Sequence, residues 1–348
     1  MAYSKTTLQQ LAAETGFSIP TVSRVLSGSS YPVNARTREV ILSAAASHGY
    51  APPTIKKMTG CAAERNTIGV VIPTMTNPFY TQLICGIENK CEQYGYTPII
   101  CSSRRSPQKE IENLRIICES GVKGILVSSI NDDLSFLSAI ARQRFPIVVF
   151  DQSVKDLDVS YVQFDYYDAG KLAVEHLYLK GHRRIAFLCP PLNRTVRLNA
   201  LDGYRSALER FQLPFREEYV IIAEEEREYD QASYDFEIGA RLAARLCTLS
   251  ERPTAVFTMN DVMALGVISG LSALGLRVPD DISIVGFDNL EISSVSSPPL
   301  TSVNQPAFEI GHLSAEILFE RLIENSTERK TINLHASIVE RSSVRSLI

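Results

Sequence analysis

The sequence lacks several features that would mark other classes of protein. It has no run of 18 or more apolar residues, which argues against a transmembrane helix. Its seven cysteines are odd in number and include no CxxC pair, which disfavours a zinc site or a thioredoxin-like redox site. The first residues lead directly into a helical pattern without a basic segment followed by an apolar one. We therefore expect no secretory signal, reduced thiols and a cytoplasmic protein.

Motifs of catalysis are also absent. The sequence contains no GxGxxG, GxxxxGKS, GxSxG or HExxH pattern, and none of its five histidines stands beside a convincing nucleophile or metal cluster. We expect a chain that is not an enzyme and that needs no cofactor or metal.

The composition is that of an ordinary folded protein, but its charge is divided unevenly. The 348 residues are 45% apolar and 21% charged, and the length suggests two or three domains. Residues 1–60 hold six basic and two acidic side chains, whereas the remaining residues hold 29 basic and 37 acidic ones. A basic head on an acidic body favours attraction to nucleic-acid phosphates at one end. The alternative is a solvated surface whose sign has no function.

The first 50 residues show only helical periodicity. Leu8 and Val22 each begin a set of apolar residues at helical spacing, and a third helix is expected over about 35–48. Asn34 is a suitable N-cap for that helix, and Gly49 is suited to its C-terminal end. Pro52 ends the helical pattern, and residues 59–66 have the composition of a linker.

From residue 67 onward, β-rich apolar runs alternate with amphipathic helical segments. This alternation is typical of parallel sheets covered by helices on both faces. The number of strands fits either two doubly wound domains or one barrel. The expected strands are 68–72, 97–101, 124–127, 146–150, 185–188, 219–222, 254–257 and 282–287. The expected helices are 79–94, 109–119, 167–180, 198–211, 236–249 and 261–274.

Residues 8–25 have the pattern of a helix-turn-helix. Ala12 is small enough for the crossing of two helices, and Gly16 allows a positive φ in the turn. Ser18 can cap the second helix, and a proline is tolerated in the first turn of that helix. The apolar residues that can join the helices are Leu11, Phe17, Val22 and Val25. The side chains left for a DNA groove are Ile19, Pro20, Thr21, Ser23 and Arg24. The alternative is a helical hairpin with no role in DNA binding.

These motifs resemble those of a known family. Residues 21–28 (TVSRVLSG), 37–38 and 48–52 are similar to the DNA-binding head of the lac repressor family of bacterial transcription regulators. The resemblance covers nearly the whole chain. The other matching segments are 68–73, 77–80, 181–186, 253–257, 260–266, 286–289, 299–303 and 340–343.

The resemblance implies an architecture. It implies an α/β protein with an all-α helix-turn-helix head (1–50), a hinge (51–66) and a periplasmic-binding-protein-like core (67–348). The core would have two doubly wound parallel-sheet lobes, which decides against the barrel. Lobe one would contain 67–164 and 296–326, and lobe two would contain 165–295 and 327–348.

The family's function follows by the same resemblance. We expect a sequence-specific DNA-binding regulator, a repressor, that binds a palindromic double-stranded operator as a homodimer and does not associate with membranes. A small metabolite would control it allosterically, and we expect a sugar or sugar phosphate. A purine or nucleoside effector is the alternative.

The resemblance places DNA contacts on the second helix. Ile19, Pro20 and Arg24 would face base edges, where Arg24 can pair with guanine through two hydrogen bonds or contact a phosphate instead. The expected phosphate contacts are Thr7, Ser18, Ser23 and Asn34.

The hinge departs from the family pattern. Pro53 stands where relatives usually have asparagine. Met58, after Lys56 and Lys57, is the candidate side chain to enter the minor groove, with Thr59 as second candidate. The alternative is a solvated linker, which is what we expect off DNA because short isolated helices are marginal.

The resemblance also implies an effector cleft. Its residues would be Phe79, Tyr80, Asp151, Gln152, Arg194, Arg197, Tyr234, Asn260 and Asp288. Acids and amides suit sugar hydroxyls, arginines donate in pairs, and aromatic rings stack on apolar faces. The alternatives are core packing for the aromatic residues and a helix cap or interlobe salt bridge for Asp288. Arg194 matches purine repressors, Arg197 lies one place from the arginine of sugar repressors, and the acidic segment 224–231 departs from the family.

Ligand binding would close the lobes and change the hinge spacing, with the sign of the response left open. The tail after Arg341 has no heptad pattern, so we expect no tetramer-forming coiled coil. The alternatives to a regulator are two other classes: an enzyme, and a sugar-binding module without DNA binding. The missing motifs disfavour the first, and the basic head disfavours the second.

Overall fold

The computed structural model describes residues 7–26, 33–48, 50, 66–151, 157–226, 228, 233–324, 326 and 328–348. The chain divides into two compact units, residues 1–64 and 65–348. Within the described residues, no helix is both long and apolar enough to cross a membrane.

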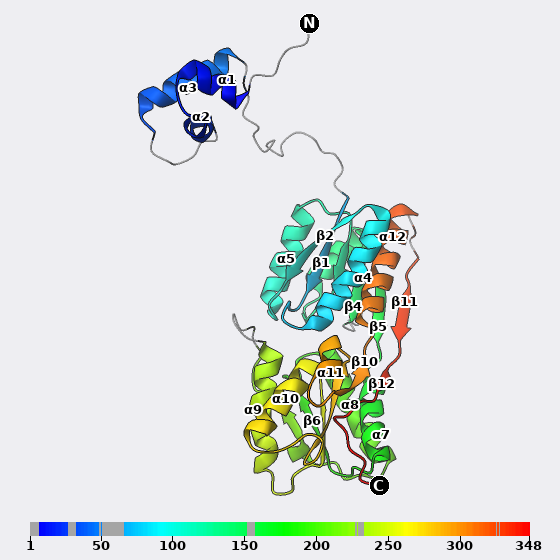
Figure 1. Ribbon diagram of the computed structural model, residues 1–348. Helices are drawn as coiled ribbons and strands as arrows, with labels where there is room; N and C mark the ends of the chain where they lie inside the picture. Colours follow the sequence, from blue (N-terminus) through cyan, green and yellow to red (C-terminus); the bar gives the residue numbers. More distant parts are fainter. Residues whose placement is uncertain are drawn as a thin grey trace. The chain divides into compact units, whose positions relative to one another are not determined.

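The described part of the smaller unit is a three-helix head, with α1 (Leu8–Thr15), α2 (Ile19–Leu26) and α3 (Ala35–Ser47) (Figure 1). Its helices begin where local chemistry predicts. Thr7 and Gln10 form a reciprocal capping box on α1, and the Asn34 side chain accepts a hydrogen bond of 3.0 Å from the Arg36 amide. Gly16 ends α1 with φ of 73°. The core of the head is Leu11, Ala12, Val22, Val25, Ile41 and Ala45.

The first sheet of the larger unit has the strand order β11-β5-β4-β3-β1-β2, and its neighbouring strands are parallel. Val70 packs in the cluster that includes α4, whereas the next residue, Val71, packs in the cluster that includes α5. This alternation covers both faces of the sheet with helices. The strands are β1 (Thr67–Ile72), β2 (Thr97–Ser102), β3 (Ile125–Val127), β4 (Ile147–Asp151), β5 (Ser160–Phe164) and β11 (Thr331–Leu334). The helices are α4 (Pro78–Tyr94), α5 (Pro107–Glu119), α6 (Ser135–Arg142) and α12 (Ala307–Ile323). We call this sheet and its helices lobe one.

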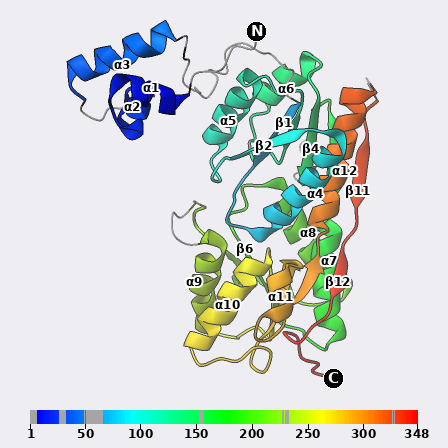
Figure 2. The ribbon, with the colours of Figure 1, turned by 45° about the horizontal axis from the view of Figure 1, so that its top comes forward.

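The second sheet has the order β12-β10-β9-β8-β6-β7, and only β12 runs antiparallel to its neighbour. Figure 2 shows α9 and α10 packed together beside it. Its strands are β6 (Ile185–Cys189), β7 (Val220–Ile222), β8 (Ala255–Thr258), β9 (Ser283–Asp288), β10 (Thr301–Asn304) and β12 (Ser337–Val339). Its helices are α7 (Tyr166–Leu179), α8 (Thr195–Arg210), the 3-10 turn Glu217–Tyr219, α9 (Tyr234–Thr248), α10 (Asp261–Ala273) and α11 (Glu291–Val295). We call this sheet and its helices lobe two.

The chain passes between the lobes after β5, after β10 and between β11 and β12. Two predicted lobe boundaries are therefore wrong. Residues 301–304, expected in lobe one, belong to lobe two because β10 pairs with β9 before the chain crosses. Residues 331–334, expected in lobe two, extend the first sheet because β11 pairs with β5. The predicted fold class, a helical head and a core of two doubly wound lobes, is confirmed.

Helix pairs pack closely through glycine. A Cβ added at Gly86 of α4 would lie 2.1 Å from the carbonyl oxygen of Phe308 in α12. In lobe two, a Cβ at Gly239 of α9 would lie 2.2 Å from the carbonyl oxygen of Met263 in α10. Each lobe thus relies on small residues to bring two backbones together.

Candidate functional site

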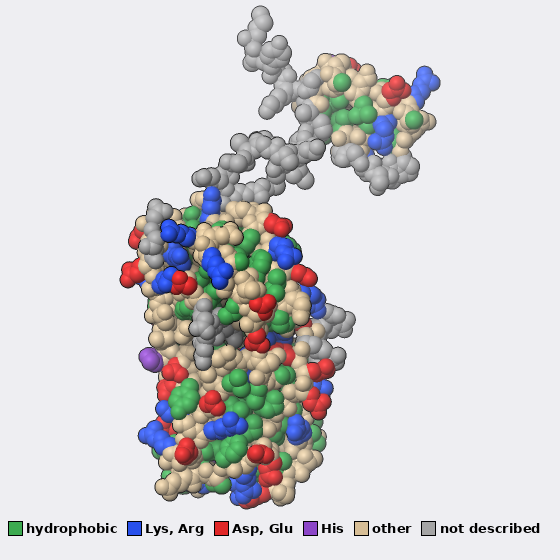
Figure 3. Space-filling model, turned by 180° about the vertical axis from the view of Figure 1, so that it is seen from behind, with side chains coloured by type: hydrophobic (Ala, Val, Ile, Leu, Met, Phe, Trp, Pro, Cys, Tyr) green, Lys and Arg blue, Asp and Glu red, His purple; other side chains and the backbone are tan. Residues whose placement is uncertain are grey.

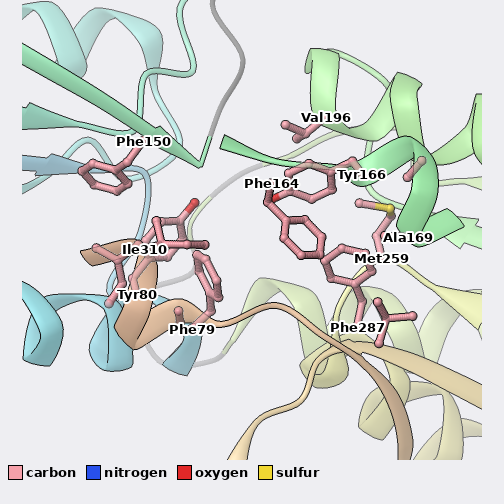
Figure 4. Close-up of a cluster of buried hydrophobic side chains, with 14 of the residues drawn as sticks. Phe79, Tyr80, Phe150, Phe164, Tyr166, Ala169, Val196, Met259, Phe287 and Ile310 are labelled. Atoms are coloured by element: carbon pink, nitrogen blue, oxygen red, sulfur yellow. The ribbon is translucent and has the colours of Figure 1, made fainter. Parts of the chain in front are cut away.

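A cavity of about 70 Å³ lies between the two lobes, at the carboxyl ends of their strands. Ligands of open α/β sheets bind at this edge because the strand-to-helix loops gather there. Aromatic side chains from both lobes form part of its lining: Figure 4 shows Phe79 and Tyr80 on one side, with Tyr166 and Phe287 on the other. The rings of Tyr166 and Phe287 are stacked, with their centroids 5.4 Å apart.

Most of the predicted effector residues lie at this cavity. Those that line it are Phe79, Tyr80, Asp151, Arg194, Arg197, Asn260 and Asp288. Phe79 and Tyr80 also belong to the main apolar cluster, so cleft lining and core packing are both present. Gln152 lies outside the described residues. The roles of these residues toward a ligand remain a prediction.

Tyr234 is fully buried and is not part of the cavity lining. Its hydroxyl donates a 2.6 Å hydrogen bond to the carbonyl oxygen of Glu225, and the guanidinium of Arg105 lies 5.0 Å from the centre of its ring. The Tyr234 side chain therefore holds the loop before α9 in place without facing the cavity.

Asp151 is buried where the two lobes meet, and several side chains donate hydrogen bonds to its carboxylate. It is the last residue of β4, with φ of 62°. Its carboxylate accepts hydrogen bonds from the Tyr166 hydroxyl, the Gln305 amide at 2.8 Å and the Tyr80 hydroxyl at 3.3 Å. Burial and the nearby Asp151 raise the pKa of both phenols above the ordinary range, so both stay protonated as donors. Because Tyr166 and Gln305 follow β5 and β10, Asp151 ties two of the three crossings together.

Asp288 ends β9 in the left-handed region, with φ of 108°. Burial raises the pKa of its carboxyl well above the ordinary value, and the charges of Asp261, Asp235 and Asp151 act in the same direction. A hydrogen bond with Asn77 opposes this effect. The predicted alternatives, a helix cap or an interlobe salt bridge, are wrong, because α11 has Leu290 as N-cap residue and no ion pair to Asp288 occurs among the described side chains. A protonated Asp288 can donate to a ligand.

Asn260 has a structural role as well as a place in the lining. Its side-chain oxygen accepts a 2.7 Å hydrogen bond from the Met263 amide and caps α10. The cap fixes the orientation of its amide group at the edge of the cavity.

Charged side chains gather inside the cleft. On the face of the core drawn in Figure 3, basic and acidic side chains are interspersed. In the cleft, by contrast, Arg194 and Arg197 bind Glu226 with nitrogen-to-oxygen distances of 2.9 and 2.7 Å. Arg105 of lobe one contacts Glu226 at 2.7 Å and Asp235 at 2.6 Å. These groups form one buried interlobe network of ion pairs.

Several residues of the cleft were not predicted from the sequence. They are Thr74, Asn77, Arg105, Tyr166, Asp235, Met259, Phe287, Gln305 and, in the ion-pair network, Glu226. A signal for Arg105 existed, since it follows the carboxyl end of a predicted strand. Tyr166 and Gln305 follow β5 and β10, which were not predicted as strands, so the sequence did not indicate that their side chains reach the cleft.

In the head, the outward face of α2 is where the predicted DNA-reading residues lie. Ile19, Pro20 and Arg24 are exposed, whereas Thr21 and Ser23 are half-buried. Ser18 accepts a 3.4 Å hydrogen bond from the Thr21 amide and so caps α2 as predicted. Thr7 and Asn34 are exposed caps of α1 and α3. Lys56, Lys57 and Met58, with Thr59, lie outside the described residues.

The described residues contain no group of three or more His, Cys, Asp or Glu side chains placed to hold a metal ion. A helix-turn-helix head and a two-lobed core with a polar cleft together define the class of DNA-binding regulators with a ligand-sensing domain.

Comparisons with known proteins agree with this class. Residues 7–53 match the model for bacterial regulatory proteins of the lacI family, and residues 174–344 match that for a periplasmic binding protein-like domain. The chain is 32% identical to the HTH-type transcriptional repressor PurR of Vibrio atlanticus over 343 residues, which are 98% of this chain and 99% of that protein. The chain belongs to the LacI family and is a transcription regulator rather than an enzyme.

Solved structures show the same fold. A LacI family regulator from Enterococcus faecium with bound ribose is 29% identical, with a TM-score of 0.71 over 81% of this chain and 100% of that one. The lac repressor dimer bound to operator and the anti-inducer ONPF is 28% identical, with a TM-score of 0.69 over 98% of this chain and 100% of that one.

Proposed function

We propose that the chain is a cytoplasmic repressor that binds a palindromic operator as a homodimer and changes its affinity when a small metabolite enters the interlobe cleft. The observation that carries the proposal is the pairing of an outward-facing α2 in the head with a cleft whose acids, amides and arginines converge between two lobes. The operator-bound dimer of the lac repressor supports the assembly.

In this proposal Arg24 reads guanine, while Ile19 and Pro20 make apolar contact with thymine methyl groups. Thr21 is a further side chain for the groove, and the contacts from Thr7, Ser18, Ser23 and Asn34 set the register on the phosphates. Thr7, Ser18 and Asn34 each stand at a helix N-terminus, where exposed backbone amides favour an anion. Lys56, Lys57 and Met58 are proposed for the minor groove at the operator centre.

The effector is proposed to be a sugar or a sugar phosphate. Asp151, Asn260 and Asp288 supply oxygens and an amide for hydroxyl groups, and the aromatic side chains supply flat apolar surfaces for a ring. The ribose-bound structure of the Enterococcus faecium regulator supports this class.

A purine or nucleoside is the second candidate. The similarity to PurR favours it, together with Arg194, which matches purine repressors and lines the cavity. A thermal-shift panel of sugars, sugar phosphates and purines on the purified chain separates the two candidates. Asp288→Ala should abolish the shift of any compound that binds in the cleft, and an unchanged shift would remove Asp288 from the site.

Selection of random duplexes by the purified full-length chain tests the DNA-binding half of the proposal. An inverted repeat should be enriched, because a two-fold symmetric dimer presents two copies of α2. Deletion of residues 1–60 should remove this enrichment. A truncated chain that bound the selected duplex as tightly as the full chain would contradict the proposal.

Arg24→Ala should weaken binding of the selected duplex by about 5- to 150-fold, because one bidentate guanine pair contributes about 1–3 kcal/mol. Non-specific binding should fall far less, and both are measured by fluorescence anisotropy at fixed salt. Arg36→Ala, at an exposed arginine of α3, is the control of equal charge and should preserve the preference for the selected sequence. Equal losses of specific and non-specific binding in Arg24→Ala would reduce Arg24 to a phosphate contact.

A further inference from the structure

Glu226 is held in the cleft as a bound carboxylate ligand would be. Its side chain is only 4% exposed, and arginine nitrogens surround both of its oxygens. Arg197 forms a two-pronged contact, with distances of 2.7 and 2.9 Å to Oε1 and Oε2, and Arg194 adds 2.9 Å to Oε1. Burial alone would raise the pKa of Glu226, but Arg194 and Arg197 lower it well below the ordinary range. The group is therefore a fully paired anion.

The position of Glu226 in the chain allows it to leave. It lies between β7, which ends at Ile222, and α9, which begins at Tyr234, and it belongs to no helix or strand. Its removal from the arginines would break no hydrogen bond of a helix or sheet. Once in water, its carboxylate would regain the hydration that burial removes.

The cavity is too small for a metabolite while the network is in place. It measures about 70 Å³, whereas pockets for small molecules usually measure about 300–1,000 Å³. Entry of a ligand therefore requires the lobes to part, a side chain to leave, or both. Glu226 is the side chain whose departure would uncover two arginines at once.

Charge decides which kind of ligand can take its place. Arg194 and Arg197 are both buried, and a buried charge that loses its partner carries a large penalty. A neutral ligand that expelled Glu226 would leave Arg194 and Arg197 without a counter-charge, although Arg197 would keep its hydrogen bonds to the Pro191 carbonyl and the Asn193 side chain. A ligand with a carboxylate or phosphate group could replace the lost ion pairs with equivalent ones.

We propose that Glu226 is an internal stand-in for the anionic group of the effector, and that the effector is a small molecule with a carboxylate or phosphate that displaces Glu226 from Arg194 and Arg197. This inference rests on the proposed function and narrows its effector class to anions.

Glu226 also joins the lobes, so the exchange affects the core as a whole. Arg105 of lobe one donates to Glu226 of lobe two, and it keeps further contacts with Glu228 at 3.0 Å and Asp235 at 2.6 Å. When an anion replaces Glu226, Arg105 remains tied to lobe two through these acids. Glu226 thus joins the lobes through Arg105, and the anion would change the partner of Arg194 and Arg197 while Arg105 keeps its ion pairs with Glu228 and Asp235.

The test compares anion binding by the intact chain and by Glu226→Gln. The probes are inorganic phosphate, ribose 5-phosphate and gluconate, with ribose and glucose as neutral counterparts, in calorimetric titrations at matched ionic strength. Glu226→Gln should bind the anions at least tenfold more tightly than the parent chain, because no internal carboxylate competes. Ribose and glucose should show no such gain. A stronger gain for phosphates than for gluconate would assign the natural group as a phosphate, and the reverse would assign it as a carboxylate.

Glu224→Gln is the matched control. It removes one negative charge from the same segment, at an exposed residue that is not part of the arginine network, and should leave the anion affinities unchanged. If Glu226→Gln does not fold, Glu226→Asp retains the charge but shortens the reach to Arg197, and a smaller gain in anion affinity is expected. Phosphate should also raise the melting temperature of the Glu226 variant more than that of the parent chain.

An anion affinity that stays equal or falls in Glu226→Gln would overturn the proposal. So would a Glu226→Gln variant that does not bind inorganic phosphate. A neutral ligand that binds the parent chain and is lost in the variant would make Glu226 an ordinary ligand contact. Duplex binding is measured on the same samples. Its persistence would show that the regulator function stands while the anion inference fails, whereas its absence would count against the proposed function itself.

Discussion

The fourth strand of each lobe ends on a buried aspartate with a left-handed backbone, Asp151 on β4 and Asp288 on β9. The two residues occupy equivalent positions because both lobes have the order second, first, third, fourth, fifth strand. Their surroundings differ. Asp151 receives hydroxyl and amide hydrogen bonds from the crossings, whereas one oxygen of Asp288 lacks a hydrogen-bond partner in the described structure.

The loops after the second strand of each lobe show the same divergence. Arg105 follows β2 in lobe one, and Glu226 follows β7 in lobe two, and these side chains meet across the cleft at 2.7 Å. The two lobes therefore share one strand order but carry opposite charges in the loop that follows the second strand. The comparison shows that the shared topology places the cleft, whereas individual side chains decide which lobe binds the crossings between the lobes and which presents an unpaired carboxyl oxygen to a ligand.

The comparison of the two aspartates predicts the largest difference. Asp151→Asn should lower the free energy of unfolding by about 3 kcal/mol, because it weakens several hydrogen bonds to a buried charged acceptor. Asp288→Asn should change it by less than about 1 kcal/mol, because burial already favours the uncharged form of Asp288. Urea denaturation of both variants measures the difference. Equal losses would mean that the two positions do the same work.

Because both lobes pack a helix pair through glycine, an alanine at either glycine should lower the free energy of unfolding by a similar amount. Gly86→Ala in lobe one and Gly239→Ala in lobe two should each cost about 1–3 kcal/mol, because the new methyl group meets a backbone carbonyl in the facing helix. Glu88→Ala, at an exposed position of α4, is the control and should change stability by less than about 0.5 kcal/mol. Thermal unfolding provides the readout. A harmless alanine at either glycine would show that the helix pair can separate without cost.

Acid should affect lobe two through His182. Its ring nitrogens contact the Thr254 hydroxyl at 3.0 Å and the Arg345 carbonyl at 3.2 Å, and burial lowers its pKa to about 4. The unfolded chain binds a proton at His182 near pH 6.5, so the stability from this group is complete above pH 6.5 and falls as the pH drops toward 4. The loss should be about 1–3 kcal/mol.

Asp261 acts in the opposite direction, since burial raises its pKa to about 6 and the folded state then holds a proton that the unfolded state releases. The effect of His182 is therefore isolated as the difference in stability between the parent chain and His182→Gln. That difference should be constant above pH 6.5 and change below it. A difference that is independent of pH from 7 to 4.5 would contradict the assignment.

The sequence predicted the elements with strong local signals. Gly16, Ser18 and Asn34 mark helix ends through their own side chains or backbone, and no distant partner is needed for that. The apolar strands of the doubly wound sheets were found because burial on both faces leaves a continuous run. The missed strands β5, β10, β11 and β12 contain polar residues such as Gln163, Ser302 and Asn333, and their assignment depends on pairing with distant strands.

The cleft was predicted in part for a related reason. Asp151, Arg194 and Asp288 stand at positions that the family resemblance marks. Arg105 and Glu226 are joined by folding alone, because 121 residues separate them along the chain. Tyr234 was predicted to line the cavity but does not, because it is the first residue of α9 and its ring lies against Arg105.

Fluorescence anisotropy of the selected duplex tests the link between the two units most directly. The titration uses the full-length chain at fixed salt, with and without a saturating amount of the compound that gives the largest thermal shift. Operator affinity should change by about 5- to 150-fold when the compound is bound, as expected for coupled binding sites, and Asp288→Ala should remove this change. Identical operator affinity with and without the bound compound would contradict the account.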